Sequence, residues 1–261
     1  MKILVCVKQV PDTTEVKLGA DFTLERDFVA QIMNPADESA LELGLALRDL
    51  RGGSVTVLTM GPERAAGMLH EALSRGADEA VLLTDPAFAG SDTLATARAL
   101  RAAHDFLGGF DLILCGRRAT DGETGQVGPM LGSLLNRACV TNVTAARVET
   151  PEQPGVANGA VSLLADQLTE DGTVLWRCAT PALLTLCEWS YRLRLPTLAG
   201  LRRAATAPVR TLTAAMLYLS PAVCGLRGSP TRVVRVSARS AGLRPCRKLT
   251  VEAFLGEGVL P

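Results

Sequence analysis

Residues 111–129 read DLILCGRRATDGETGQVGP, and this stretch decides the fold. Its apolar run 112–115 predicts a buried strand, and the segment that follows the loop predicts a helix. Three glycines of the loop let the backbone approach a ligand closely: Gly116, Gly122 and Gly125. The N–H groups of such a loop and the helix dipole together suit a phosphate. An ordinary turn with structural glycines stays the alternative.

Strand-like runs alternate with helical patterns through the first half of the chain. The predicted strands cover residues 3–7, 55–60, 80–83 and 112–115, and the predicted helices cover residues 36–50, 63–74, 92–107 and 126–135. This alternation predicts an α/β fold with a doubly wound, mostly parallel, Rossmann-like sheet that is covered by helices on both faces.

The pattern changes in the second half of the chain. Strand-like runs at 140–148, 159–164, 173–178 and 183–187 are joined by turns, which predicts an antiparallel extension of the sheet. After Glu188 the periodicity fades, and prolines and glycines interrupt the chain. We therefore predict a nucleotide-binding domain over residues 1–189 and an extended C-terminal arm over residues 190–261, which either is disordered or becomes ordered by wrapping a partner.

Composition narrows the possible functions. Twenty-seven basic residues balance 27 acidic ones, so global charge points to neither nucleic acid nor a membrane surface. No apolar run approaches the roughly 20 residues that span a bilayer. Seven cysteines without a disulfide framework or a signal peptide predict a cytoplasmic protein. No Cys/His set has the spacing of metal ligands, and no nucleophile has an evident base, so we expect no metal and no catalytic residue.

Four polar or glycine-rich segments follow predicted strands or precede a predicted helix. They cover residues 6–12, 34–37, 60–61 and 116–127. Ligands of open parallel sheets bind beyond the carboxyl ends of the strands, so the fold would bring these segments to one rim. The sequence therefore predicts a nucleotide site there, although it lacks the G-x-G-x-x-G fingerprint and the P-loop lysine.

Residues 121–129, DGETGQVGP, resemble the D-G-D-T-A-Q-V-G-P nucleotide loop of electron transfer flavoprotein β subunits, in particular of their flavin-bifurcating branch. Further matches occur in the family's order: CVKQVPDT at 6–13, MNPADESALE at 33–42, TMGP at 59–62, LSRGAD at 73–78, RLPTLAGL at 194–201 and GLRGSPTRVV at 225–234. The resemblance therefore covers most of the chain.

The resemblance implies a cofactor, FAD, with AMP as the alternative. The residues expected to bind it are Cys6, Gln9, Asp12, Asn34, Pro35, Ala36, Asp37, Met60, Gly116, Arg117, Arg118, Ala119, Thr120, Asp121, Gly122, Glu123, Thr124, Gly125, Gln126 and Val127. It also implies a recognition loop that docks on an acyl-CoA dehydrogenase or a related redox partner. That loop comprises Arg194, Leu195, Pro196, Thr197, Leu198, Ala199 and Gly200.

The function that the resemblance implies is electron transfer. The chain would pair with an electron transfer flavoprotein α subunit and move electrons between dehydrogenases and a downstream acceptor, with flavin-based bifurcation as an option. It would be an electron-transfer subunit rather than a catalyst with its own substrate chemistry. The alternative is a stand-alone adenine-nucleotide-binding domain without a redox role. An ATP-cleaving synthetase would need an S-G-G-x-D-S-type loop after the first strand, where this chain has KQVPD at residues 8–12.

Overall fold

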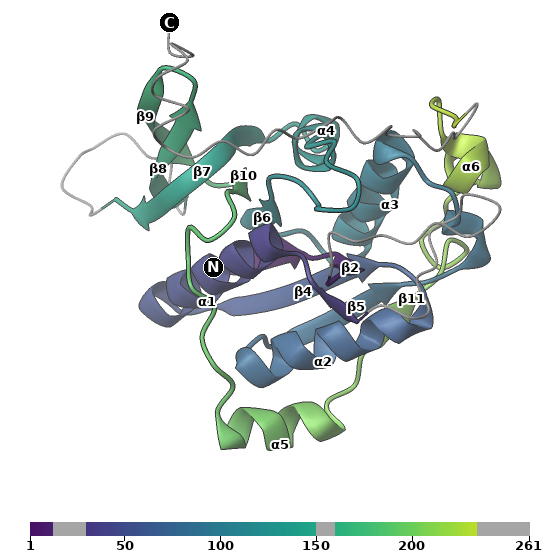
Figure 1. Ribbon diagram of the computed structural model, residues 1–261, viewed down its shortest axis with the longest axis horizontal. Coiled ribbons are helices and arrows are strands. Elements are labelled where there is room, and N and C mark those ends of the chain that lie inside the picture. The colour runs from purple at the N-terminus through teal and green to yellow at the C-terminus, as the bar shows by residue number, and fades with distance from the viewer. Residues whose placement is uncertain (13–29, 150–159, 234–261) are drawn as a thin grey trace, which may run out of the picture. The chain divides into compact units, whose positions relative to one another are not determined.

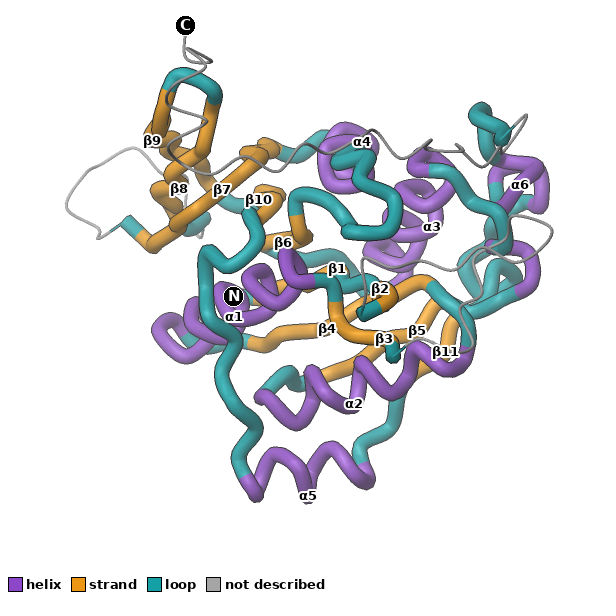
Figure 2. Tube along the Cα trace, viewed as in Figure 1, coloured by secondary structure: helices purple, strands orange, loops and turns teal. Residues whose placement is uncertain are grey.

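The computed structural model describes residues 1–12, 30–149 and 160–233. One sheet of nine strands runs through it in the order β11-β5-β4-β1-β6-β10-β7-β8-β9 (Figures 1 and 2). Its strands are β1 (Lys2–Cys6), β4 (Ser54–Met60), β5 (Glu79–Leu83), β6 (Leu112–Gly116), β7 (Ala138–Val148), β8 (Ser162–Thr169), β9 (Gly172–Ala179), β10 (Ala182–Leu186) and β11 (Arg210–Leu212). A separate antiparallel pair consists of β2 (Gln9–Pro11) and β3 (Gln31–Met33).

From β11 to β7 every neighbouring pair of strands is parallel, whereas β8 and β9 are antiparallel to their neighbours. The helices are α1 (Pro35–Arg51), α2 (Ala66–Arg75), α3 (Thr93–Phe106), α4 (Val127–Leu134), α5 (Leu198–Thr206) and α6 (Gly225–Gly228). Short 3₁₀ turns lie at Glu63–Ala65, Pro86–Phe88 and Pro221–Val223. This arrangement confirms the predicted α/β fold with a mostly parallel sheet and an antiparallel extension.

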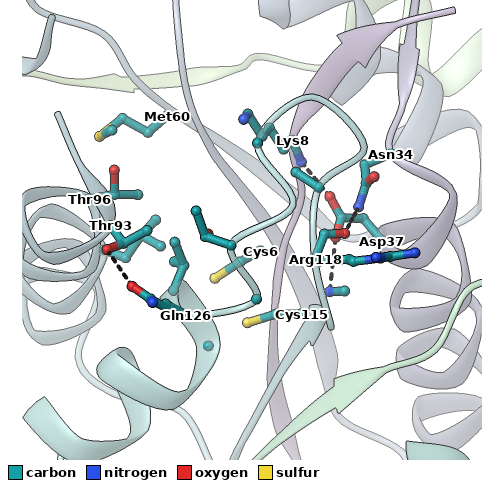
Figure 3. Close-up of a pocket in the computed structure, with 18 of the residues that line it drawn as sticks. Cys6, Lys8, Asn34, Asp37, Met60, Thr93, Thr96, Cys115, Arg118 and Gln126 are labelled. Carbon is teal, nitrogen blue, oxygen red and sulfur yellow. Dashed lines mark hydrogen bonds between the residues drawn. The ribbon is translucent and has the colours of Figure 1, made fainter. Parts of the chain in front are cut away.

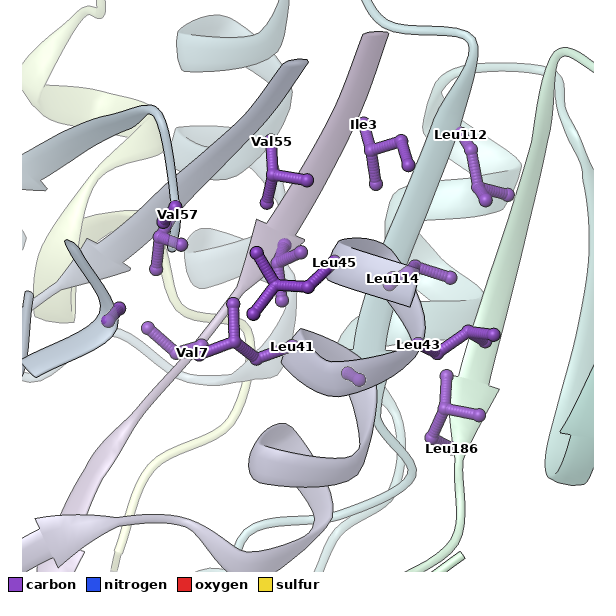
Figure 4. Packing of buried hydrophobic residues seen from close by; sticks show 14 of the residues in the cluster. Ile3, Val7, Leu41, Leu43, Leu45, Val55, Val57, Leu112, Leu114 and Leu186 are labelled. Atoms are coloured by element: carbon purple, nitrogen blue, oxygen red, sulfur yellow. The ribbon is translucent and has the colours of Figure 1, made fainter. Parts of the chain in front are cut away.

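Two apolar cores lie on opposite faces of the sheet, because successive side chains of a strand point to opposite faces. Ile3 and Val5 of β1 belong to the core that includes the α1 leucines (Figure 4). Leu4 and Cys6 belong to the other core, together with residues of α3 such as Leu100. The parallel strands are therefore apolar on both faces, as a doubly wound sheet requires.

The start of α1 lies at the carboxyl ends of the parallel strands. Asn34 precedes the helix, and Pro35 stands at its first position, where a missing N–H costs nothing. Asp37 lies in the first turn and the basic residues Arg48 and Arg51 lie in the last, so both ends complement the helix dipole. This charge pattern favours a helix that begins where the chain enters the predicted site.

The strand β10 corrects one part of the prediction. We expected its residues, 183–187, to extend the sheet in antiparallel fashion, but β10 lies between β6 and β7 and runs parallel to both. Ala182–Leu186 is buried at every position. An interior parallel strand and a buried antiparallel strand are both continuous apolar runs in the sequence, so periodicity alone does not distinguish them.

The stretch after Glu188 contains several short elements that periodicity did not reveal, among them α5 and β11. The three residues of β11 pair with β5 at the sheet edge, and Leu212 and Leu217 are buried. Elements this short obtain their stability from the surface on which they pack, so they leave little pattern in the sequence. The role of residues 190–261 as a partner-wrapping arm stays a prediction, and residues 234–261 lie outside the described part of the chain.

All these elements, within the described residues 1–12, 30–149 and 160–232, belong to one compact unit. The rest of the chain lies outside the described residues, apart from Val233. Within the described ranges, no helix is both long and apolar enough to cross a membrane.

Candidate functional site

A pocket of about 540 Å³ lies at the rim where the nucleotide site was predicted (Figure 3). Its lining comes from the carboxyl ends of β1, β4 and β6, from the loop 116–126, and from the beginnings of α3 and α4. Two helix N-termini therefore contribute to one pocket, and each carries the partial positive charge of its helix dipole. The arrangement suits an anionic group.

The lining combines apolar and polar side chains. Leu58, Met60 and Leu100 supply apolar surface. Cys6 and Cys115 add thiols from opposing positions of the neighbouring strands β1 and β6. The loop 116–126 adds backbone and polar groups. Such a pocket can hold a ring system and fix an anionic tail, which is the chemistry of a nucleotide.

Part of the loop 116–126 has a left-handed backbone. Gly125 has φ +62°, a region that glycine enters without strain, and Glu123 has φ +49°. The Glu123 N–H donates to the Ala119 carbonyl at 2.8 Å, which closes the turn. The Thr93 hydroxyl donates to Gln126 Oε1 at 3.2 Å, so the starts of α3 and α4 are linked at the pocket.

Two buried side chains at the start of α1 connect the segments around the pocket. Asp37 accepts hydrogen bonds from the Lys8 N–H at 2.7 Å and from the Gly116 N–H at 2.9 Å. Asn34 donates to the Arg118 carbonyl at 2.9 Å and accepts from the Thr120 N–H at 3.2 Å. The loops after β1 and β6 are therefore held by the same helix turn.

Burial raises the pKa of Asp37 to about 7, against an ordinary value of 3.8. The hydrogen bonds from Lys8, Asn34 and Gly116 lower this pKa, but they do not offset the loss of water around the carboxylate. The hydrogen bond between the Cys115 and Cys6 thiols, together with burial, raises the pKa of the Cys115 thiol well above its ordinary value. Cys115 is therefore a protonated, unreactive thiol at neutral pH.

The cationic side chains of the site are already paired. Lys8 Nζ lies 2.6 Å from Asp121 Oδ1. Arg117 Nε and Arg118 Nε lie 2.7 and 3.1 Å from the Glu188 carboxylate. Backbone N–H groups and helix dipoles therefore supply most of the attraction for an anion in this conformation.

Most of the residues predicted to bind the nucleotide line the pocket. Those that do not are Gln9, Asp12, Pro35, Ala36, Thr120 and Asp121. Three of them have another role: Ala36 is fully buried, Thr120 donates its N–H to Asn34, and Asp121 pairs with Lys8. They lie beside the pocket wall and support it.

The prediction missed several lining residues. Lys8, Ser91, Asp92, Thr93, Thr96 and Thr231 all contribute to the pocket. Asp92 caps α3 and also accepts hydrogen bonds from the N–H and hydroxyl of Thr231, which brings the GSPT motif to the rim. The order of elements in the sequence could have placed the start of α3 at the pocket. The N-terminus of α3 follows β5, so it lies at the same rim of the sheet as the starts of α1 and α4.

The predicted docking segment, residues 194–200, is held firmly on one side. Arg194 lies 2.9 Å from Glu42 and 2.7 Å from Asp49, and its carbonyl accepts from Arg75 at 2.6 Å. Thr197 caps α5 by accepting the Gly200 N–H at 2.9 Å. The segment's apolar side chains face solvent: Leu195 and Leu198 are 79% and 67% exposed. Exposed leucines on an anchored segment are an arrangement that suits a protein partner.

Comparison with known proteins agrees with this geometry. The model of the electron transfer flavoprotein domain matches residues 21–217. The chain is 43% identical to the electron transfer flavoprotein subunit beta of Thermoanaerobacterium thermosaccharolyticum, over 91% of this chain and 88% of the relative. It is 42% identical to protein FixA of Azorhizobium caulinodans, over 92% and 85% of the two chains.

A further relative belongs to a named complex. The caffeyl-CoA reductase-Etf complex subunit CarD of Acetobacterium woodii is 40% identical over 90% of this chain and 87% of the relative. The family model covers well over half of the chain, and the curated relatives align along nearly its whole length. The chain therefore belongs to the electron transfer flavoprotein family, among its beta subunits.

Proposed function

We propose that this chain binds FAD in the pocket at the rim of the sheet and, paired with an alpha subunit, passes electrons between a dehydrogenase and a second acceptor. The observation that carries the proposal is the convergence of two helix N-termini and the loop 116–126 on one pocket that also has apolar walls. The relatives named as subunits of electron-transfer complexes favour this function over a stand-alone nucleotide-binding domain.

The residues present fit a dinucleotide. The N–H groups of the loop and the first turns of α3 and α4 would hold the phosphates, and Lys8 is close enough to the pocket to exchange Asp121 for a phosphate oxygen. Leu58, Met60 and Leu100 would exclude water from the ring system. When bound, a flavin supplies the one- and two-electron chemistry that no side chain of this site offers.

FAD is preferred to AMP on two grounds. The loop and the GSPT motif resemble the flavin-bifurcating branch, and Thr231 of that motif lines the pocket. One relative is named as a subunit of a caffeyl-CoA reductase-Etf complex, and another as an electron transfer subunit of acryloyl-CoA reductase. We therefore also propose that the assembled complex carries one flavin on each subunit and splits electron pairs between two acceptors.

A count of bound nucleotides tests the cofactor. The full-length chain is co-expressed with its alpha partner, and the purified heterodimer is extracted with acid and analysed by chromatography. We expect two FAD per heterodimer. One FAD with one AMP would refute FAD and keep the nucleotide site, whereas a single FAD without AMP would refute the site itself.

A loop variant assigns the second flavin to this chain. Gly125→Val places a β-branched residue at φ +62°, which should distort the loop that cradles the phosphates. This heterodimer should contain one FAD. The control is Gly67→Ala in α2, where an added Cβ meets nothing within 4 Å, and it should retain two.

We further propose that the segment 194–200 docks the redox partner, an acyl-CoA dehydrogenase or a related enzyme. Its support is the exposed pair Leu195 and Leu198 on a segment fixed to α1 by Arg194. Apolar anchors at the centre of an interface contribute most of its affinity, so a charge there should be costly.

Replacing Leu198 with glutamate should therefore slow electron transfer from the partner dehydrogenase at least tenfold through a higher KM. The nucleotide content and the melting temperature should not change, because the side chain is 67% exposed. The matched control is Leu50→Glu in α1, a leucine that is 71% exposed outside this segment. Equal kinetics of the two variants would contradict docking through Leu198.

A further inference from the structure

The two side chains that begin α1, Asn34 and Asp37, bind four backbone groups of the pocket wall. Asp37 accepts from the N–H groups of Lys8 and Gly116, at 2.7 and 2.9 Å. Asn34 binds the Arg118 carbonyl and the Thr120 N–H, at 2.9 and 3.2 Å. Both side chains lie between α1 and the pocket wall in Figure 3, and both residues are buried, with 1% and 5% of their surface exposed.

These four bonds join the two segments that flank the crevice of the sheet. Lys8 follows β1, and Gly116, Arg118 and Thr120 end β6 or follow it. The chain leaves β1 toward β4 on one side, while β6 lies on the other side, so the order of the strands reverses between β1 and β6. Ligands of open α/β sheets bind at such a switch point, and the width of this crevice depends on where the two segments sit.

We propose that Asn34 and Asp37 are positioning residues: together they hold both sides of the crevice in the nucleotide-binding arrangement, and the ionised Asp37 is required for this. Nucleotide affinity should then depend on the protonation of Asp37. This inference rests on the proposed nucleotide function and adds a regulation of the same site.

The carboxylate is required because it faces two donors. Each of its oxygens accepts one N–H, and neither Lys8 nor Gly116 can turn its N–H elsewhere without moving the backbone. A protonated carboxyl group keeps one good acceptor and turns the other oxygen into a donor. One of the two segments then loses its bond and is free to shift, since a buried N–H without a partner is costly.

Titratable and charged groups face Asp37 from each neighbouring element. Lys8 comes from the segment after β1 and favours the ionised form, although its ammonium is paired with Asp121. Cys115 comes from β6, and its raised pKa keeps it neutral. Arg118 comes from the loop after β6 and is bound to Glu188, and Glu38 is the neighbour of Asp37 on α1 itself. Burial raises the pKa of Asp37 to about 7, so its carboxylate gains or loses a proton within the physiological range of pH.

The test is the pH profile of nucleotide binding. The full-length chain, in complex with its alpha partner, is stripped of nucleotide and titrated with FAD and separately with AMP between pH 6 and 8.5. We expect the affinity of the wild type to weaken about tenfold as the pH falls through 7. Asp37→Asn cannot accept both N–H groups, so it should bind about tenfold more weakly than the wild type at pH 8.5, with no pH dependence across the range.

A matched variant separates this effect from general changes of charge. Asp105→Asn removes a carboxylate at the end of α3 that pairs with Arg101 and His104 and does not line the pocket, so its profile should follow the wild type. Asn34→Ala removes the other half of the pair. It should weaken binding while keeping the pH dependence, and it gives a second measurement if Asp37→Asn folds poorly.

The outcomes also distinguish this inference from the proposed function. If the wild-type complex binds neither FAD nor AMP at this site at any pH, the proposed function fails. If it binds one of them with the same affinity across the range, or if Asp37→Asn keeps the wild-type profile, the nucleotide site stands and the positioning role of Asp37 is overturned.

Discussion

Replacing Gly116 with alanine should lower the free energy of unfolding by about 2–3 kcal/mol, which is typical for overpacking a tight contact. A Cβ at this position would overlap Asp37 Oδ1 and lie 2.7 Å from Ala36 Cβ and 2.9 Å from the Ala36 carbonyl carbon. The latter belongs to the backbone of α1, which a side-chain rotation does not move. The start of α1 would have to separate from β6, and the bonds of Asn34 and Asp37 to the loops would lengthen.

Urea denaturation followed by circular dichroism measures this loss. The control is Gly67→Ala, in the first turn of α2, which should leave stability unchanged or raise it by up to about 1 kcal/mol because alanine favours a helix. Gly116→Ala should also lose the nucleotide of this chain. If both variants unfold at the same urea concentration as the wild type, the close contact between α1 and β6 is not needed for stability.

The second large effect is the pH dependence of stability through Asp37. Its pKa is about 7 in the folded chain and near 3.8 when the chain is unfolded. Between these values the folded chain keeps the proton and the unfolded chain has released it, so a rise in pH favours unfolding. The stabilisation by the buried neutral acid is complete below pH 4 and is lost as the pH rises through 7. Its upper limit is about 4 kcal/mol.

The difference in the free energy of unfolding between the wild type and Asp37→Asn separates the contribution of Asp37 from those of the other carboxylates. The free energy of unfolding of the wild type, minus that of the variant, should fall between pH 4 and 7 and become constant above pH 8. The same subtraction with Asp105→Asn should not show that fall, because Asp105 is exposed. A difference for Asp37 that stays constant from pH 4 to 8 would mean that the carboxyl group is ionised throughout.

Both effects depend on the same contact, between the start of α1 and the end of β6. Gly116 allows α1 to approach β6 closely, and that approach buries Asp37 against the Gly116 N–H. Burial raises the pKa of the carboxyl group, and the same burial makes its hydrogen bonds hard to replace. The neutral acid favours the folded chain as a whole, whereas the ionised form is the one that holds both loops.

The local pattern of the sequence determined most of the fold. Alternation of apolar runs and helical periods predicted strands such as β1 and β6 and helices such as α1 and α3 to within a few residues. The motifs around 34–37 and 116–127 predicted one rim, since parallel strands end at the same edge of a sheet. Periodicity indicates which side chains are buried, and the order of the motifs indicates the family. The buried positions and the family can therefore be predicted from the sequence alone.

The tertiary structure decided which elements are neighbours. Only the sheet shows that β10 inserts between β6 and β7, and that β11 pairs with β5. In the site, only the folded chain brings Thr231 to the pocket and buries Asp37 between two backbone N–H groups. Strand order, burial depth and pKa depend on groups far apart in the sequence, because each is set by what packs against a residue and not by its neighbours along the chain.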